Sequence, residues 1–213
     1  MTAGQARAWA RGWGRLGREL GDLPPGPADL DAWFGRPAPV VLEIGSGMGE
    51  TTARLAAAAP EVNYLAVEVY QPGLAQLLMR AEELELANLR LLRGDAVALL
   101  DQHIAPGSLA EVRIFFPDPW PKTRHHKRRL IQPGFVALVA SRLAAGGLLR
   151  LATDWEHYAE QMLAVCQAEP ALRNRYPEWA PRPEWRSVTK FEGRAEQAGR
   201  TSRDLVFERR DSE

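Results

Sequence analysis

The sequence lacks the features on which several protein classes depend. Its 213 residues contain one cysteine, Cys166, so the chain can form neither an internal disulfide nor a zinc cluster of cysteines. No apolar run is long enough to span a membrane, and the N-terminus lacks the apolar core of a signal peptide. We therefore expect a cytoplasmic protein with no membrane partner and a reduced, inert cysteine.

The sequence also lacks a net charge. Its 27 Lys and Arg residues are balanced by 27 Asp and Glu residues. Bulk charge therefore does not indicate a nucleic-acid partner, and any such partner must be inferred from a local cluster. The 46% hydrophobic and 25% charged residues are ordinary for a globular protein. The length suits one domain that carries an appendage.

Residues 1–38 are predicted to be an N-terminal basic arm, outside a domain formed by residues 39–213. Trp9 and Trp13 would share one face of a helix in this arm, and another face would carry Arg7, Arg11, Arg15 and Arg18. Three glycines weaken that helix by up to about 1 kcal/mol each. The arm is either a segment that orders on RNA or a loosely ordered tail, and we favour the tail.

From Val40 onward, short apolar strands alternate with helical stretches. Strands are expected at 40–44, 64–67, 89–92, 112–116 and 148–152, and helices at 49–59, 71–86, 134–144 and 155–169. This alternation predicts βαβ units and a parallel sheet, which is an α/β fold. Two final strands are expected at 188–191 and 205–208, after a long irregular connection that is rich in proline and tryptophan.

Acidic residues end or follow four successive predicted strands, at Glu43, Glu68, Asp95 and Asp118. Gly45 and Gly47 follow the first strand, and glycine lets the backbone approach a ligand closely. The carboxyl ends of parallel strands are where such folds bind nucleotides. Each acid taken alone is better explained as a helix cap or a solvated turn. Together, the four acids suit a cationic ligand that carries ribose and adenine, which describes S-adenosylmethionine.

The most distinctive stretch is Phe116-Pro117-Asp118-Pro119-Trp120-Pro121. Its alternating prolines exclude both a helix and a sheet ladder, so we expect a stiff loop. A carboxylate and an aromatic ring on such a loop suit a flat, hydrogen-bonding ring such as a nucleobase. Fixed positive charges follow at Lys122, Arg124, Lys127, Arg128 and Arg129. Their natural partner is a phosphate chain, and the alternative is a solvated basic face.

His125 and His126 lie inside this basic run. They lack partners at the spacing of a metal site, so we interpret them as part of the basic face and expect no metal.

Together these motifs closely resemble the bacterial tRNA (guanine-N7)-methyltransferases. The match is carried by residues 43–47, 67–68, 94–96, 116–122 with the basic run to 129, 152–154 and 189–192, and it covers roughly residues 38–209. The resemblance implies a Rossmann-like class I methyltransferase fold, with a seven-stranded, mostly parallel sheet, an antiparallel last strand and helices on both faces. The sequence departs from the family pattern at Ser187 and at Gly199-Arg200.

The family resemblance implies transfer of a methyl group from S-adenosylmethionine to N7 of a guanine in the variable loop of tRNA. It implies that the four acids and the two glycines surround the cofactor, with Asp118 in the active site. It also implies substrate contacts from Lys122, from Asp154, and from the box formed by Thr189, Lys190, Phe191 and Glu192. A monomer and a homodimer both remain open.

Three alternatives are weighed against this interpretation. An exocyclic-amine methyltransferase also places an acid or amide beside prolines and an aromatic residue after its fourth strand. A catalytically silent RNA-binding module could keep the fold, although the loss of the cofactor acids would then be expected. A nicotinamide dehydrogenase is disfavoured by Glu43 and by the spacing of the glycines.

Overall fold

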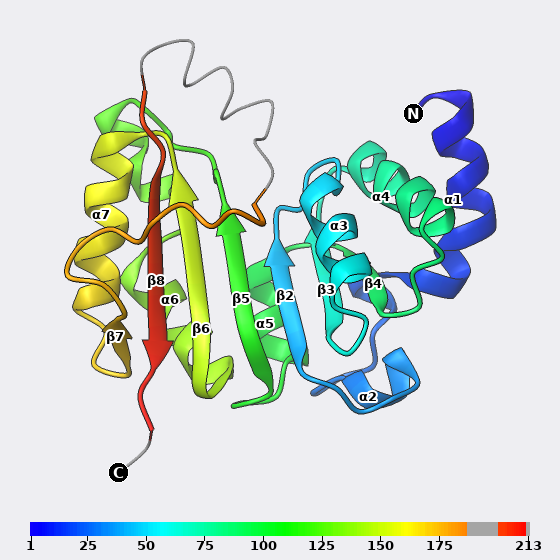
Figure 1. Ribbon diagram of the computed structural model, residues 1–213, viewed down its shortest axis with the longest axis horizontal. Helices are drawn as coiled ribbons and strands as arrows, with labels where there is room; N and C mark the ends of the chain where they lie inside the picture. The colour runs from blue at the N-terminus through cyan, green and yellow to red at the C-terminus, as the bar shows by residue number, and fades with distance from the viewer. Residues whose placement is uncertain (187–199, 212–213) are drawn as a thin grey trace. The chain divides into compact units, whose positions relative to one another are not determined.

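The computed structural model describes residues 1–186 and 200–211, in two compact units that meet in sequence between Leu109 and Ala110. In each unit strands are accompanied by helices (Figure 1). Within the described residues, no helix has both the length and the apolar character needed to cross a membrane.

Four parallel strands form the first unit, in the order β1-β4-β3-β2. Their bounds are β1 Gly17–Glu19, β2 Val40–Ile44, β3 Asn63–Glu68 and β4 Leu89–Arg93. All five residues of β2 are buried, as expected for a parallel strand covered on both faces. Because the strands are parallel, the carboxyl ends of β2, β3 and β4 lie at one edge of the sheet.

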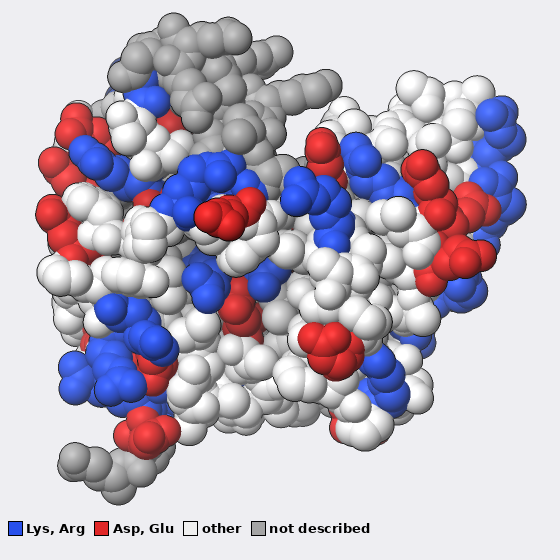
Figure 2. Space-filling model, viewed as in Figure 1, with Lys and Arg blue, Asp and Glu red and all other residues white. Residues whose placement is uncertain are grey.

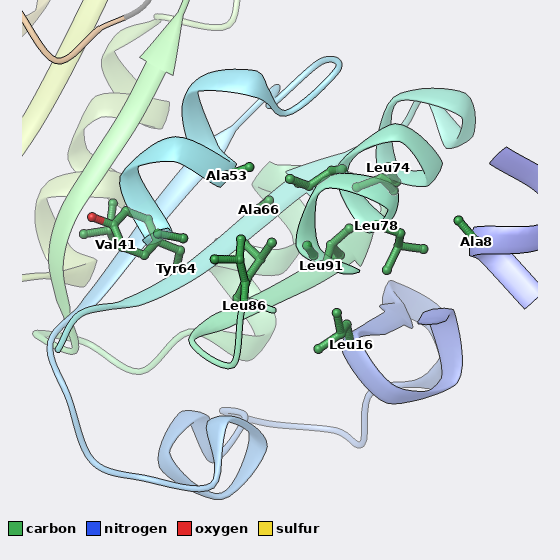
Figure 3. Close-up of a cluster of buried hydrophobic side chains, with 14 residues drawn as sticks. Ala8, Leu16, Val41, Ala53, Tyr64, Ala66, Leu74, Leu78, Leu86 and Leu91 are labelled. Carbon is green, nitrogen blue, oxygen red and sulfur yellow. The ribbon is translucent and has the colours of Figure 1, made fainter. Parts of the chain in front are cut away.

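Helices cover the strands of the first unit on both faces (Figure 1). Their bounds are α1 Ala3–Leu16, α2 Leu30–Phe34, α3 Glu50–Ala58, α4 Gln71–Glu83 and α5 Ala96–His103, with a short 3-10 helix at Leu20–Asp22. Figure 3 shows the core on one face, where Tyr64 and Leu91 of the strands meet Ala53 of α3 and Leu74 of α4. The predicted strands and helices from Val40 to Arg93 are thus confirmed.

The N-terminal segment is a packed helix, so the predicted loosely ordered tail is wrong. Thr2 and Gln5 form a capping box at the start of α1. Ala8 and Leu16 are buried in the same core as α4 (Figure 3). Burial of these side chains outweighs the low helix propensity of the glycines. Trp9 and Trp13 lie together on one face, as predicted, and their rings stack with centroids 3.9 Å apart.

Contacts with α4 hold α1 in place. Arg11 donates from Nε and Nη2 to the Glu82 carboxylate, at 3.0 and 2.6 Å. A Cβ atom on Gly12 would lie 3.2 Å from the side chain of Leu78, so this glycine permits a close approach of the two helices. The division of function at residue 38 stays a prediction.

Four strands form the second unit, in the order β5-β6-β8-β7. Their bounds are β5 Leu109–Phe115, β6 Leu143–Thr153, β7 Leu172–Asn174 and β8 Arg203–Arg209. The last strand, β8, runs antiparallel to both β6 and β7, which confirms the predicted antiparallel end of the sheet. The helices are α6 Pro133–Arg142 and α7 Glu156–Gln167, with a 3-10 helix η2 at Thr123–Arg128.

Two details of the second unit differ from prediction. Strand β6 begins at Leu143 and continues through Gly146 and Gly147, where the sequence predicted a break between helix and strand. Strand β7 lies in the region that was predicted to be irregular, and it is held by antiparallel pairing with β8. The strand predicted at 188–191 lies outside the described residues.

Candidate cofactor and RNA sites

A tight glycine turn joins β2 to α3. Gly45, Gly47 and Gly49 have φ values of 77°, 56° and 69°, in the left-handed region that glycine adopts readily. The Gly45 N–H donates to the Val67 carbonyl at 2.9 Å, which ties the turn to β3. Ser46 Oγ is buried here and has no hydrogen-bond partner within the described residues. A buried hydroxyl without a partner is typical of a site whose ligand supplies the bond.

Glu43 and Glu68 are held rigidly on either side of this turn. Glu43 is buried at the end of β2, and its carboxylate accepts from Thr52 Oγ1 at 2.9 Å. The Glu68 carboxylate accepts from the N–H groups of Gly47 at 3.0 Å, Val69 at 2.8 Å and Tyr70 at 2.9 Å. A carboxylate has about four acceptor positions, so Glu68 keeps one for a ligand hydroxyl.

Asp95 follows β4 at the same edge of the sheet. Its Oδ1 accepts from the Ala98 N–H at 2.8 Å and caps the N-terminus of α5. Asp95 thus forms the helix cap that is common for an aspartate at this position. The cap uses one carboxylate oxygen, and the other can accept from a ligand. Val69 and Tyr70 are exposed at 68% and 58% beside this edge. Exposed apolar side chains next to fixed acceptors suit a flat ring that carries amino and hydroxyl groups.

The proline loop of the second unit has a strained backbone. Phe116 and Trp120 have φ values of 52° and 44°, which are rare for bulky residues and cost on the order of 1–3 kcal/mol each. The Phe116 N–H donates to the Ala152 carbonyl at 2.8 Å, and the Arg186 guanidinium lies 5.1 Å from the Phe116 ring centroid. Asp118 is exposed between the two strained residues. The loop therefore presents a carboxylate from a backbone with little freedom.

Trp120 is packed within the loop rather than free on both faces. The Arg128 guanidinium lies 5.0 Å from its ring centroid, and the His125 ring meets it edge-on at 5.9 Å. Lys122 and the exposed side chains of η2 form a basic surface directly after this loop: Lys122, Arg124, Lys127 and Arg128. The predicted phosphate-binding residues other than Arg129 thus lie together on the surface.

Arg129 does not belong to that surface, and its predicted contact with RNA is corrected. The residue is only 2% exposed. Its Nε donates to the Pro119 carbonyl at 2.8 Å, and its Nη1 donates to Gln161 Oε1 at 2.6 Å. The chain turns inward at the end of η2, so the last charge of the run packs against α7.

Asp154 follows β6 and forms an ion pair. Its Oδ2 accepts from Arg200 Nε at 2.9 Å, while Arg200 also lies 5.9 Å from the Trp155 ring centroid. An incoming donor must share or replace Arg200 at this carboxylate. Residues 187–199 are not described, so Thr189, Lys190, Phe191 and Glu192 lie outside the described residues.

A second group of arginines lies on β7 and β8 and directly after them, where basic side chains gather at the lower left of Figure 2. Arg173 and Arg175 both donate to Glu208, and these hydrogen bonds lower the pKa of that carboxyl. Arg209 donates to the Leu143 carbonyl and Arg210 to the Leu172 carbonyl. Since these guanidiniums are each paired within the protein, we do not assign them to a nucleic acid.

The described residues contain no group of three or more His, Cys, Asp or Glu residues that could hold a metal ion. His126 packs against His157 with ring centroids 5.0 Å apart. Burial, and then the charge of Arg129, lower the pKa of His126. The buried Cys166 has a pKa raised by burial to about 12, so its thiol is unreactive at neutral pH.

Sequence reasoning missed Ser46, Thr52 and Arg200 as members of these sites. Ser46 stands between the two predicted cofactor glycines, which is a signal that could have marked it. Thr52 lies nine positions after Glu43, in the first turn of α3, so a helix N-terminus close to a buried acid was the available signal. Arg200 was marked only as a departure from the family pattern, because its pairing with Asp154 depends on the tertiary fold.

Comparisons with known proteins identify the family of this chain. The methyltransferase family model Methyltransf_4 matches residues 37–205. The tRNA (guanine-N(7)-)-methyltransferase of Streptomyces coelicolor is 54% identical, over 98% of this chain and 77% of its own. The enzyme of the same name from Paraburkholderia xenovorans is 56% identical, over 99% of this chain and 80% of its own.

Solved structures show the fold. The 16S rRNA methyltransferase KamB superimposes with a TM-score of 0.65 at 15% identity, covering 91% of this chain and 99% of its own. A methyltransferase from Thermoplasma acidophilum gives a TM-score of 0.54 at 17% identity, covering 92% and 82%. The predicted Rossmann-like methyltransferase fold is therefore confirmed. The predicted count of seven strands is corrected, because the described residues form eight, including the short strands β1 and β7 that the sequence did not predict.

Proposed function

Because this chain belongs to the tRNA (guanine-N7)-methyltransferase family, we propose that it transfers a methyl group from S-adenosylmethionine to N7 of a guanine in tRNA, and that this guanine lies in the variable loop. The observation that carries the proposal is identity above one half along nearly the whole chain to proteins named for this activity.

The first unit offers groups that fit the cofactor. Ser46 Oγ is a buried polar atom in need of a partner, and the turn at Gly45 and Gly47 lets the backbone approach a ligand closely. Glu43 suits an ammonium group, directly or through a water, and Glu68 suits a ribose hydroxyl. The open oxygen of Asp95 suits the adenine amino group. When bound, the cofactor supplies an electrophilic methyl group on a sulfonium.

Methyl transfer to guanine N7 requires no general base from the protein. Guanine N7 already carries an in-plane lone pair, so no residue needs to remove a proton before the methyl is transferred. Most of the acceleration therefore comes from holding N7 in line with the methyl group. The guanine ring gains positive charge as the new bond forms. A carboxylate beside it stabilises the transition state more than the ground state.

Asp118 supplies that carboxylate in our proposal. Its exposed position on a rigid, strained loop supports this role, because a pre-organised charge needs no rearrangement during the reaction. Asp154 and Glu192 accept from the N1–H and the amino group of guanine. Lys122, Arg124, Lys127 and Arg128 hold backbone phosphates, which position the RNA without reading its sequence. Trp120 either stacks on a base or supports the loop, and both roles remain open.

The proposal is tested by methyl transfer from labelled S-adenosylmethionine to unmodified tRNA, with the product nucleoside identified by mass. We expect N7-methylguanosine in the variable loop. A methylated exocyclic amine would instead support the rival activity, in which Asp118 holds an amino group. These products also differ chemically, since only N7-methylguanosine is cationic and opens its ring in alkali.

The role of Asp118 is tested by the substitution Asp118→Ala. We expect turnover to be nearly abolished while tRNA affinity is largely kept, because the carboxylate acts on the reacting ring. The measurements are single-turnover rates at saturating tRNA and separate tRNA binding titrations. Equal losses of rate and affinity would show that Asp118 serves binding instead.

A further inference from the structure

Arg129 connects the proline loop to α7 through its own side chain. Pro119, which lies between Asp118 and Trp120, receives a hydrogen bond on its carbonyl from Arg129 Nε at 2.8 Å. The Nη1 atom of the same guanidinium donates to Gln161 Oε1 at 2.6 Å. One buried side chain thus ties the loop to a helix.

The α7 side of this connection is itself fixed. The Nε2 of Gln161 donates to the Ile131 carbonyl at 3.1 Å, and the Ile131 N–H donates to the Tyr158 hydroxyl at 3.1 Å. The Tyr158 ring lies under the guanidinium of Arg129, 4.6 Å from centroid to Cζ. An aromatic ring attracts a cation to its face, and more strongly where water is excluded. The guanidinium therefore has a defined place before any substrate binds.

The burial of Arg129 is not explained by packing alone. Its Nη2 atom is buried and has no hydrogen-bond partner within the described residues. Burying a charge costs desolvation free energy, and an unpaired nitrogen leaves part of that cost without compensation. What the guanidinium adds is directed hydrogen bonds from a fixed fork to Pro119, Gln161 and, at 3.4 Å, His157 Nδ1. The first of these bonds ends on the loop that carries Asp118.

The backbone of the loop shows what that hydrogen bond controls. Proline fixes its own φ near −65° but leaves ψ free. The ψ angle of Pro119 sets the direction of its carbonyl, and Arg129 holds that carbonyl. The same rotation carries the chain into Trp120, whose φ of 44° is unfavourable without support.

The geometry points to Arg129 as a positioning residue for Asp118: by holding the Pro119 carbonyl it anchors the backbone that directly follows Asp118, and thereby the place from which the carboxylate projects. Arg129 touches neither RNA nor cofactor in this role. The inference rests on the proposed function of Asp118. It assigns to the last arginine of the basic run a task different from that of its exposed neighbours.

A kinetic comparison tests the positioning role. In Arg129→Ala we expect the single-turnover rate at saturating substrates to fall by about 100-fold, as a misplacement of about 1 Å does. Arg129→Lys should be impaired as well, because an ammonium group lacks the planar fork that reaches both acceptors. Affinities for tRNA and S-adenosylmethionine should stay within about threefold of the unaltered protein, because a positioning residue acts on the rate rather than on binding.

Arg210→Ala is the matched control. Arg210 is exposed in the same unit, and its Nε also donates to a backbone carbonyl, that of Leu172 at 3.1 Å. We expect the single-turnover methylation rate of Arg210→Ala to equal that of the unaltered protein. All rates are measured well below the melting temperatures of the variants, so that a general loss of stability does not lower them.

A second measurement needs no catalytic activity. The lysine-specific protease Lys-C cleaves after Lys122, three residues beyond Pro119. If Arg129 holds the loop, the fragment of residues 1–122 should appear about tenfold or more faster from Arg129→Ala than from the unaltered protein, because native cleavage follows local opening. The Arg210→Ala control should cleave at the unaltered rate.

The outcomes separate the two ideas. Equal Lys-C cleavage of Arg129→Ala and the unaltered protein, or a methylation rate within about twofold of it, would overturn the positioning role. A weakened tRNA affinity with an unchanged rate would return Arg129 to the RNA-binding group. If the unaltered protein forms no N7-methylguanosine, the proposed function fails, and the cleavage comparison still decides whether Arg129 holds the loop.

Discussion

The substitution Gly73→Ala should weaken cofactor binding without unfolding the protein. Gly73 lies in the first turn of α4 and is buried against the glycine turn that follows β2. A Cβ atom at this position would lie 2.2 Å from the Gly47 carbonyl oxygen and 3.0 Å from its carbonyl carbon. Ordinary contact begins at 3.4 Å, so the turn and the helix must separate by roughly 1 Å to accommodate the added carbon.

The turn should move rather than the helix. The helix is held by its own hydrogen bonds, including Gly73 N–H to the Tyr70 carbonyl at 2.9 Å and Leu74 N–H to the same oxygen at 3.3 Å. Overpacking of this kind costs about 1–3 kcal/mol. If that free energy falls wholly on the cofactor-binding conformation of the turn, affinity drops by roughly 5- to 150-fold.

The assay is a binding titration with S-adenosylmethionine, accompanied by thermal unfolding followed by circular dichroism. Gly134→Ala is the control, because Gly134 also lies in the first turn of a helix, α6, and a Cβ there would meet nothing within 4 Å. The control should bind the cofactor normally and be more stable by up to about 1 kcal/mol. Unchanged cofactor affinity in Gly73→Ala would refute the assignment of this turn to the cofactor.

Two further predictions concern Leu16 and Cys166. Leu16→Ala should destabilise the protein by about 2–5 kcal/mol, because Leu16 is 3% exposed in the core beneath α1. The melting temperature should fall by roughly 4–20 °C. A loss of stability below about 0.5 kcal/mol would show that α1 does not stabilise the unit. Burial raises the pKa of Cys166 to about 12, so at pH 8 the folded protein should not react with a thiol reagent such as DTNB. Denatured protein should release one equivalent of the coloured thiolate product per chain, from its single cysteine. Rapid reaction of the folded protein would contradict this burial.

The sequence predicted the central strands well because their signal is local. Val40–Ile44 and its neighbours are short apolar runs bounded by acids and glycines, and such runs form strands wherever a core can cover them. The placement of Glu43, Glu68 and Asp95 at one edge followed from the same reasoning, since a parallel sheet brings the carboxyl ends of its strands to one edge. Their placement needed no knowledge of side-chain contacts.

Features that depend on tertiary contacts were not predictable. Helix α1 looked weak because of its glycines, yet its burial against α4 decides its conformation. Arg129 looked like its neighbours, because a run of basic residues does not reveal which member turns inward. The left-handed backbone at Phe116 and Trp120 could not be foreseen, because bulky residues adopt it only where the surrounding structure enforces it.

The strained backbone around Asp118 bears on how this protein tolerates mutation. Glycine or asparagine relieves a left-handed φ such as those of Phe116 and Trp120. A search for heat-resistant variants that scored folding alone would reward such replacements wherever the lost packing is small. The relieved loop would then sample more conformations, and Asp118 would lose its fixed direction. Selection for thermal resistance and selection for methylation therefore oppose each other at these two positions.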